Sequence, residues 1–162
     1  MSDSFPMTPA CLQRLRDELR QLKSEERAKN VAEIEAALEH GDLRENAEYH
    51  AAKERQAALD ARMRYLEQRI ARANVLDPAT IESDTVGFGA TVTLLDMETE
   101  QTKVYALVGE DESDVDRGHI SINSPIARAL VGKREGDIVT VRLPRGEVEY
   151  EISELVYQAL QG

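Results

Sequence analysis

Residues 49–73 carry a repeat of mostly apolar side chains that strongly constrains how this part of the chain can fold. The members of the repeat follow one another at alternating steps of three and four residues without a break: Tyr49, Ala52, Gln56, Leu59, Met63, Leu66, Ile70 and Ala73. In an α-helix this spacing places every member on one face. The repeat therefore predicts a helix with a single seam of the coiled-coil kind. About 28 residues of such a helix would form an arm roughly 40 Å long.

A second helix is predicted upstream of this one. Thr8 and Pro9 mark its start, because Thr is a good N-cap and a proline at the first helical position loses no hydrogen bond. An apolar stripe follows, weakens across residues 25–30, resumes, and stops at His40 and Gly41, a plausible C-cap. The stripe consists of Leu12, Leu15, Leu19, Leu22, Val31, Ile34 and Leu38. We expect a local change of packing register near residues 25–30.

Only residues 41–46 separate the two predicted helices. Helices joined by so short a connection can bury both stripes only by folding back antiparallel on one another. The sequence therefore predicts a helical hairpin with residues 41–46 at its tip.

After residue 77 the apolar period changes to two, which is typical of strands. Four segments are predicted as strands: 90–94, 103–108, 138–143 and 148–152. A turn at 144–146 joins the last two, and residues 124–132 have the cap, proline and final glycine of a short helix. The expected fold class is α+β, with an N-terminal antiparallel coiled-coil hairpin domain at 1–77 and a C-terminal domain at 78–162 made of an antiparallel sheet and a short helix.

The charge of the chain bears on its partners. The formal net charge is -11, with 13 Lys and Arg against 15 Asp and Glu in residues 1–77, and 7 against 16 in residues 78–162. Phosphate backbones repel such a chain unless a local basic surface overcomes the overall field. Aromatic residues make up 4% of the chain and there is no Trp, so stacking platforms for single-stranded nucleic acid are scarce. A protein partner is expected.

Cysteine use and hydropathy indicate the compartment. Cys11 is the single cysteine, which excludes an intrachain disulfide and fits a reducing environment. The sequence has no apolar run of about 18 residues and no signal peptide at residues 1–8. We expect a soluble, cytoplasmic and monomeric protein without a membrane partner.

Two acidic residues of the predicted tip, Asp42 and Glu45, allow two interpretations. Their spacing of three is that of a capping box, in which they would satisfy backbone N–H groups at the start of the second helix. Alternatively, two carboxylates at the end of a thin arm offer oxygen ligands to Mg²⁺, which usually takes one or two carboxylates together with ligands from elsewhere. In the second interpretation the pair would share a metal ion with a partner's site.

Two long motifs resemble a known family. The segment GDLRENAEYHAAKE at 41–54 is similar to the hairpin-tip signature of bacterial Gre transcript cleavage factors, and more so to the GreA branch than to GreB. The segments VGFGATV at 86–92 and ISINSPIARAL at 120–130 resemble the family's C-terminal signatures. The likeness spans nearly the whole chain in the right order.

The resemblance implies a function. A Gre factor inserts its coiled coil into the secondary channel of a backtracked bacterial RNA polymerase, whose own active site then cleaves the 3′ end of the nascent RNA and so rescues the arrested complex. Asp42 and Glu45 would help to hold a Mg²⁺ ion shared with the polymerase, with no metal or other cofactor bound tightly by the factor alone. The protein would then be a cofactor of the polymerase's endonucleolytic activity and no enzyme itself.

The resemblance also implies roles outside the acidic pair. The C-terminal domain would have an FKBP-like fold and dock on the polymerase through Asn123, Ser124 and Pro125. Capping of the short helix explains Ser124 and Pro125 equally well. Arg44, Lys53 and Arg55 would lie near the RNA, although interleaved acids explain basic residues on this helix as ion pairs.

Two other classes of function remain open from the sequence. A Gre-like inhibitor would occupy the polymerase channel without promoting cleavage, but it has no need of the Asp42 and Glu45 pair. A coiled-coil adaptor with an unrelated sheet domain would explain the periodicities, but it leaves both signature motifs unexplained.

Overall fold

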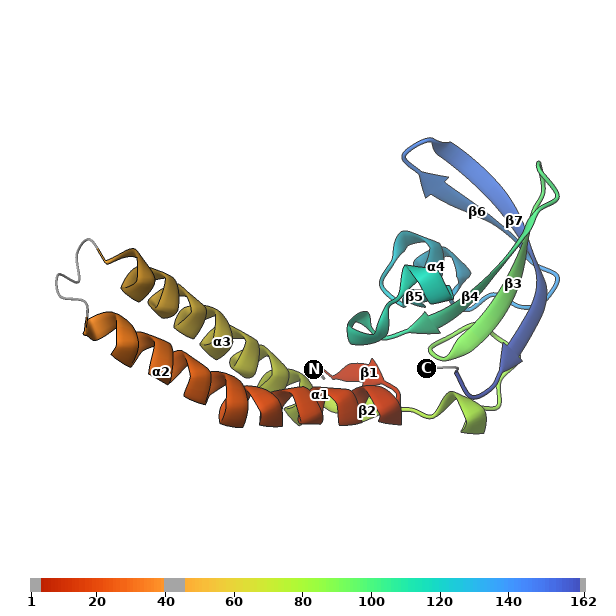
Figure 1. Ribbon diagram of the computed structural model, residues 1–162. Coiled ribbons are helices and arrows are strands. Elements are labelled where there is room, and N and C mark those ends of the chain that lie inside the picture. Colours follow the sequence, from red (N-terminus) through yellow and green to blue (C-terminus); the bar gives the residue numbers. More distant parts are fainter. Residues whose placement is uncertain (1–3, 40–45, 161–162) are drawn as a thin grey trace. The chain divides into compact units, whose positions relative to one another are not determined.

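The structure is a computed structural model that describes residues 4–39 and 46–160, and the chain divides into two compact units (Figure 1). One unit, Leu12–Ala73, is the hairpin unit. The other, the sheet unit, combines Met1–Cys11 with Asn74–Gly162. The first eleven residues thus group with the C-terminal part, and the expected domain boundary at residue 77 stays a prediction.

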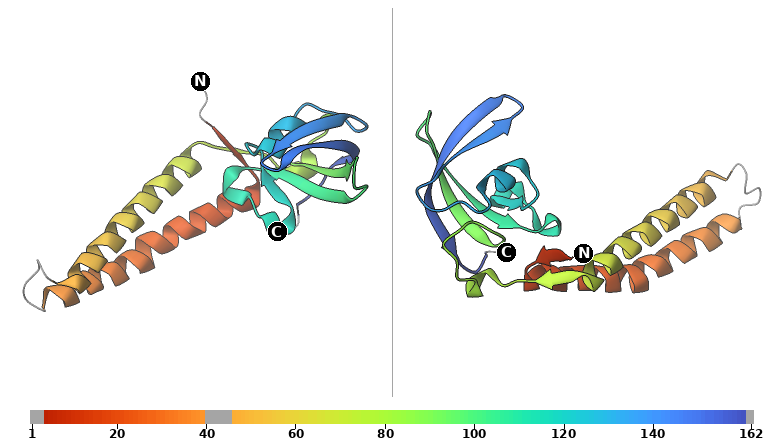
Figure 2. Two further views of the ribbon diagram at one scale, coloured as in Figure 1. Left: turned by 90° about the horizontal axis from the view of Figure 1, so that it is seen from above. Right: turned by 180° about the vertical axis from the view of Figure 1, so that it is seen from behind.

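The predicted helical hairpin is confirmed. Its first arm contains α1 (Pro9–Gln21), the π-helix η1 (Leu22–Glu26) and α2 (Arg27–Leu38), and its second arm is α3 (Ala47–Ala71). The ribbon views show α2 and α3 lying side by side along their lengths (Figures 1 and 2). No helix among the described residues combines the length and the apolar character needed to cross a bilayer.

The seam predicted for the second helix is confirmed. Every member of the repeat from Tyr49 to Ala73 is buried or half-buried, and Ala52, Met63 and Leu66 are the most enclosed. The helix ends at Ala71, so Ala73 belongs to a short strand. An unbroken α-helix keeps its spacing, and for that reason the periodicity locates the buried face correctly.

Beyond residue 30 the stripe predicted for the first helix is wrong at Val31 and Leu38, whereas its third member, Ile34, is half-buried. Val31 and Leu38 are 44% and 47% exposed, whereas Asn30 and Ala37 are 3% and 1% exposed. The expected register change near residues 25–30 does occur, at η1, where a π-helical turn takes up one extra residue. The face that contains Leu22 therefore continues at Asn30 and Ala37, one position later than unbroken α-helical spacing gives. A stripe at Val31 and Leu38 would need a shift of two positions.

The sheet unit contains a five-stranded sheet with strand order β5-β4-β3-β7-β6. Its strands are β3 (Ala90–Asp96), β4 (Thr102–Val108), β5 (His119–Ser121), β6 (Ile138–Leu143) and β7 (Gly146–Tyr157), and the short helix is α4 (Pro125–Leu130). The four predicted strands and the helix are confirmed. The expectation of a wholly antiparallel sheet is wrong in one place, since β5, which is too short for the period to reveal, pairs parallel with β4.

The core of the sheet unit is apolar and closed. It joins α4 to one face of the sheet, and its members are Val86, Ala90, Val92, Leu94, Leu107, Ala127, Leu130, Val139, Val141, Tyr150 and Ile152. Seven of these residues are 0% exposed. Burial of this much apolar surface is the main stabilising term for a domain of this size.

The first residues of the chain are anchored within the sheet unit. Strand β1 (Phe5–Met7) pairs with β2 (Ala73–Val75), and neither strand is predicted by the sequence periodicity. The Glu112 carboxylate accepts hydrogen bonds from the backbone N–H and the hydroxyl of Thr8, the residue that precedes α1. A Cβ placed on Gly109 would lie 2.3 Å from the Pro6 carbonyl oxygen, so this close approach requires glycine.

Candidate functional site

The acidic tip residues predicted from the sequence, Asp42 and Glu45, lie outside the described residues, as does Arg44. Their two neighbours on the hairpin are described. Glu39 is the C-cap of α2, and Asn46 is the N-cap of α3. The geometry of the site is therefore built from these two anchors.

At the described end of the hairpin, the Asn46 side chain makes hydrogen bonds to both helices. Its Oδ1 accepts a hydrogen bond from the Tyr49 backbone N–H at 3.0 Å, which caps α3. Its Nδ2 donates to the Ala37 carbonyl oxygen at 2.6 Å. Ala37 lies in the last turn of α2, where carbonyl groups lack the partner four residues further on. Asn46 thus completes the N-terminus of one helix and ties it to the C-terminal turn of the other.

The position of this cap tests one of the two interpretations of the acidic pair. A capping box would make Asp42 the N-cap of the second helix, but α3 begins at Ala47 and its N-cap is Asn46. The capping-box interpretation of Asp42 and Glu45 is therefore wrong. The interpretation that they act as metal ligands in a partner's site stays a prediction.

Of the basic residues predicted to lie near RNA, Lys53 and Arg55 are described and both are exposed on α3. The Lys53 amine donates to the neutral Gln56 side chain at 2.7 Å. Arg55 instead makes two hydrogen bonds to the Glu33 carboxylate on α2, with Nε at 3.1 Å from Oε1. The ion pair found for Arg55 thus crosses to the facing helix, whereas the sequence suggested partners along the same helix.

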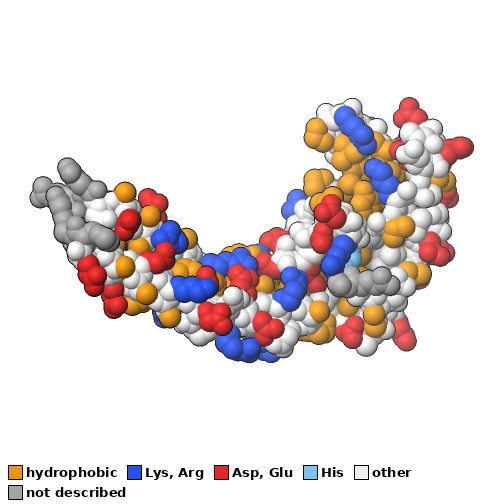
Figure 3. Space-filling model, viewed as in Figure 1, with side chains coloured by type: hydrophobic (Ala, Val, Ile, Leu, Met, Phe, Trp, Pro, Cys, Tyr) orange, Lys and Arg blue, Asp and Glu red, His pale blue; other side chains and the backbone are white. Residues whose placement is uncertain are grey.

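A second cross-helix ion pair lies further from the tip. Two guanidinium nitrogens of Arg62, Nε and Nη2, donate to the Glu18 carboxylate at 2.7 and 2.8 Å. The hydrogen bond from Arg62 lowers the pKa of Glu18 below its usual value. The space-filling view shows Lys and Arg mixed with Asp and Glu along the visible face of the hairpin (Figure 3). This mixture favours a protein partner over a continuous phosphate-binding track.

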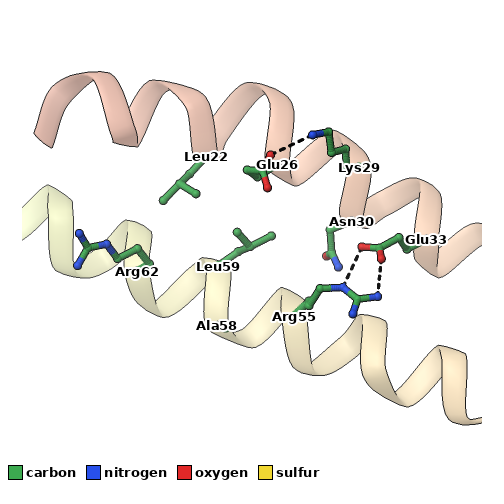
Figure 4. A pocket seen from close by; sticks show the side chains of 9 residues that line it. All are labelled: Leu22, Glu26, Lys29, Asn30, Glu33, Arg55, Ala58, Leu59 and Arg62. Carbon is green, nitrogen blue, oxygen red and sulfur yellow. Dashed lines mark hydrogen bonds and ion pairs between the residues drawn. The ribbon is translucent and has the colours of Figure 1, made fainter. Parts of the chain in front are cut away.

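Two grooves flank the seam of the hairpin. The larger has a volume of about 410 Å³, and Figure 4 shows the side chains that line it, with Leu22 and Leu59 facing each other and Arg55 paired to Glu33. The smaller, of about 260 Å³, is lined by Val31, Gln56 and Met63 among others. Asn30 and Leu59 line both grooves and so lie between them.

The predicted docking residues lie together at the start of α4. Ser124 is the N-cap, with its hydroxyl oxygen accepting from the Ala127 N–H at 3.3 Å, and Pro125 occupies the first helical position. Capping thus accounts for these two residues. Asn123 has a different role, because its Nδ2 donates to Glu110 at 2.5 Å and fixes the loop before the helix. The docking role of all three residues stays a prediction.

The described part of the chain contains no group of three or more His, Cys, Asp or Glu side chains that could hold a metal ion. The predicted metal ligands, Asp42 and Glu45, supply two carboxylates. Such a donor set suits Mg²⁺, which accepts few protein ligands and completes its shell with water and phosphate oxygens. The residues present therefore fit an ion shared with a partner.

Sequence reasoning missed two residues that shape this end of the hairpin, Asn30 and Asn46. A signal existed for Asn46, because Asn is among the strongest N-cap residues and it directly precedes the good helix formers Ala47 and Glu48. Asn30 gave no such signal, since a polar residue between two stretches of an apolar stripe reads as solvent-exposed.

Comparison with known proteins gives matches over both units. Residues 5–75 match the family described as "Transcription elongation factor, N-terminal", and residues 81–157 match "Transcription elongation factor, GreA/GreB, C-term". The transcription elongation factor GreA of a Nitratiruptor species is 52% identical over 161 residues, which is 99% of this chain and 98% of the relative. The factor of the same name from Alkalilimnicola ehrlichii is 50% identical over 94% of this chain and 97% of its own length.

Solved structures align over a similar extent. GreA factor homolog 1 (Gfh1) of Thermus thermophilus covers 94% of this chain and 98% of its own, at 27% identity and a TM-score of 0.44.

A helical hairpin followed by a sheet with one short helix is the arrangement that the N-terminal and C-terminal models of transcription elongation factors match in turn. The family matches together span most of the chain, and the GreA relatives align over nearly its full length. The chain belongs to the GreA/GreB family of transcription elongation factors.

Proposed function

We propose that this elongation factor stimulates the cleavage of backtracked nascent RNA by bacterial RNA polymerase. In this proposal the hairpin enters the secondary channel of the enzyme and brings Asp42 and Glu45 to its active site. The chemistry belongs to the polymerase, and the factor acts in the cytoplasm as a monomeric cofactor. The observation that carries the proposal is the capping of α3 by Asn46, because the acidic pair is then not explained as the cap of that helix.

Asp42 and Glu45 would hold a Mg²⁺ ion together with groups of the polymerase. When bound, it would complete a two-metal site, in which one ion aids the attacking water and the other stabilises the leaving oxygen. The two carboxylates supply oxygen ligands and orient them. A pair of carboxylates binds Mg²⁺ weakly alone, so the ion would be held only in the complex.

The described basic residues contribute differently in this proposal. Lys53 is exposed and bonded to a neutral side chain, so its positive charge is available to an RNA phosphate. The charge of Arg55 is compensated by Glu33 on the facing helix, which supports a structural role for it within the hairpin. Arg44 belongs to the tip segment and would accompany the acidic pair.

Docking is assigned to the loop before α4. Asn123 is held by Glu110, and Ser124 and Pro125 start the helix, so the three residues form a pre-ordered surface. A rigid loop loses little conformational entropy when it binds. This supports a contact with the polymerase outside the channel, which would leave the hairpin free to deliver the acidic pair to the active site.

The test is cleavage of 3′-labelled RNA in a stalled, backtracked elongation complex with Mg²⁺. Asp42→Asn and Glu45→Gln keep the shape of each side chain and remove its charge. We expect each to lower the cleavage rate at saturating factor by about 100-fold or more, since metal-ion stabilisation of the transition state amounts to several kcal/mol. Glu39→Gln is the matched control, because it makes the same change at the exposed C-cap of α2 and should cleave normally.

Normal cleavage by both tip variants would contradict the proposal. Another result would favour the inhibitory alternative: a wild-type factor that releases no RNA fragment yet slows elongation, or that blocks another channel-binding factor.

A further inference from the structure

Asn30 is a buried polar residue in the seam of the hairpin. Figure 4 shows its side chain directed at α3. There Nδ2 donates to the Ala52 carbonyl oxygen at 2.8 Å. Ala52 lies inside α3, so its carbonyl group also takes part in the helix's own hydrogen bonding. Burial of an amide is unfavourable unless it is hydrogen-bonded, so Asn30 stabilises the arrangement in which its amide reaches this carbonyl.

Asn46 makes the same kind of bond in the opposite direction. Asn30 on α2 donates to α3, and Asn46 at the start of α3 donates to Ala37 on α2. The two bonds join the same pair of helices about 10 Å apart, the rise of the seven residues from Asn30 to Ala37. We call these two side chains and their acceptors, Ala37 and Ala52, the asparagine clamp.

The apolar packing beside the clamp specifies the register of the helices only weakly. The fully buried residues around it are small, namely Ala37 on α2 and Ala52 on α3. Grooves of about 410 and 260 Å³ lie on the two sides of Asn30. Large interlocking side chains would resist sliding of one helix along the other, and these are sparse here.

The π-helix η1 brings Asn30 into the seam. Because it holds one residue more than an α-helical turn, Asn30 and Ala37 face α3 in place of Lys29 and Ala36, which unbroken spacing from Leu22 would bring there. The larger apolar side chains of Val31 and Leu38 are nearly half exposed and add little to the seam. A single buried Asn fixes register in coiled coils because any other alignment leaves its amide buried and unbonded.

We propose that the asparagine clamp fixes the axial register of α2 against α3, and with it the relative positions of Glu39 and Asn46. The tip segment is joined to the two helices at these residues, so the clamp sets both of its anchors. Asn30 and Asn46 are positioning residues, and their effect on cleavage rests on the function proposed above.

The register itself is measured first. Spin labels at Glu35→Cys and Arg64→Cys, two exposed positions on opposite arms, report the axial offset of the helices in the full chain with Cys11→Ala. Asn30→Leu removes the first bond. Asn46→Ser keeps a good N-cap but has no amide to reach Ala37. We expect either variant to shift or broaden the distance distribution, by about 5.4 Å for a slip of one turn.

The functional readout separates positioning from stability. At saturating factor we expect the cleavage rate of both variants to fall by about 100-fold, the typical effect of a 1 Å misplacement of reacting groups. The half-saturating concentration for polymerase should stay unchanged, and the melting temperature of Asn30→Leu should be unchanged or higher. Met63→Leu, a volume-conserving change in the same seam, is the control and should alter neither the distances nor the cleavage rate.

Each outcome decides the question. Unchanged distances in both asparagine variants would overturn the clamp, whatever the factor does to RNA. Shifted distances with full cleavage would overturn its positioning role. If the wild-type factor stimulates no cleavage, the proposed function fails, while the distance measurement still tests the clamp.

Discussion

Different interactions stabilise the interior of each of the two units. The sheet unit closes an apolar core of eleven residues between α4 and one face of its sheet. The described hairpin has one line of contact, in which small residues, a buried amide and cross-helix ion pairs alternate with a few large apolar side chains. Substitutions in the sheet unit should therefore change stability, whereas many substitutions in the hairpin should change geometry at nearly constant stability.

The largest effect is expected from Leu107→Ala, a change on β4 in the core of the sheet unit. Leu107 is 0% exposed, and a truncated core leucine leaves a cavity that costs about 2–5 kcal/mol. Urea unfolding followed by tyrosine fluorescence measures the loss. The exposed β4 residue Val104 serves as control, since Val104→Ala should cost far less. Equal losses for both changes would contradict the account of a closed core.

A smaller loss is expected from Gly109→Ala. The new Cβ would lie 2.3 Å from the Pro6 carbonyl oxygen, a backbone atom that can move only with its strand. Overpacking of this kind costs about 1–3 kcal/mol. The thermal midpoint measures the loss, and faster hydrogen exchange in β1 would show that residues 5–7 are released. Gly132→Ala is the control, because a Cβ there meets nothing within 4 Å and only the left-handed backbone is strained, so β1 should exchange as in wild type.

In the hairpin, Asn46→Ala should cost about 0.5–2 kcal/mol, the usual loss for an N-cap. The variant removes both the cap of α3 and the bond to Ala37. Circular dichroism at 222 nm during thermal unfolding gives the loss, and Asn46→Ser should recover most of it. A Ser variant as unstable as the Ala variant would place the stabilisation in the bond to Ala37 instead.

The smallest effect concerns the Glu18 and Arg62 pair. The pKa of Glu18 is lowered in the folded state, so its stabilising contribution is present above its ordinary value of 4.5 and is lost as the pH falls through the lower, folded value. Both side chains are more than a third exposed, so Glu18→Gln should cost only about 0.2–1 kcal/mol at pH 7. Thermal midpoints of wild type and variant should converge in acid, and a constant difference down to pH 3 would contradict this linkage.

The same contrast explains how far the sequence could predict the structure. The strands and the seam of α3 follow from periodicity because their side chains alternate or repeat without interruption. The buried face of the first arm could be predicted only up to η1, because a π-helical turn shifts the apolar repeat. No residue type in Leu22–Glu26 indicates such a turn. Strands β1, β2 and β5 are three residues each, too short for any period.

At the candidate site, the acidic pair could be found from the tip motif, but its capping interpretation was wrong because Asn46 was overlooked. Asn30 could not be found, since its burial depends on the rotation that η1 introduces. The spacing of apolar residues cannot predict polar contacts that depend on how closely two helices approach each other.

The π-helix also makes the position of a length change in the first arm important. Because η1 holds one residue more than an α-helical turn, deletion of one residue within Leu22–Glu26 would leave a chain that can form an uninterrupted α-helix and still present Asn30 and Ala37 to α3. The same deletion inside the regular helix α2 would turn the residues after it by about 100° relative to α3. A shortening by one residue is thus expected to be tolerated within Leu22–Glu26 and to disrupt the hairpin elsewhere in this arm.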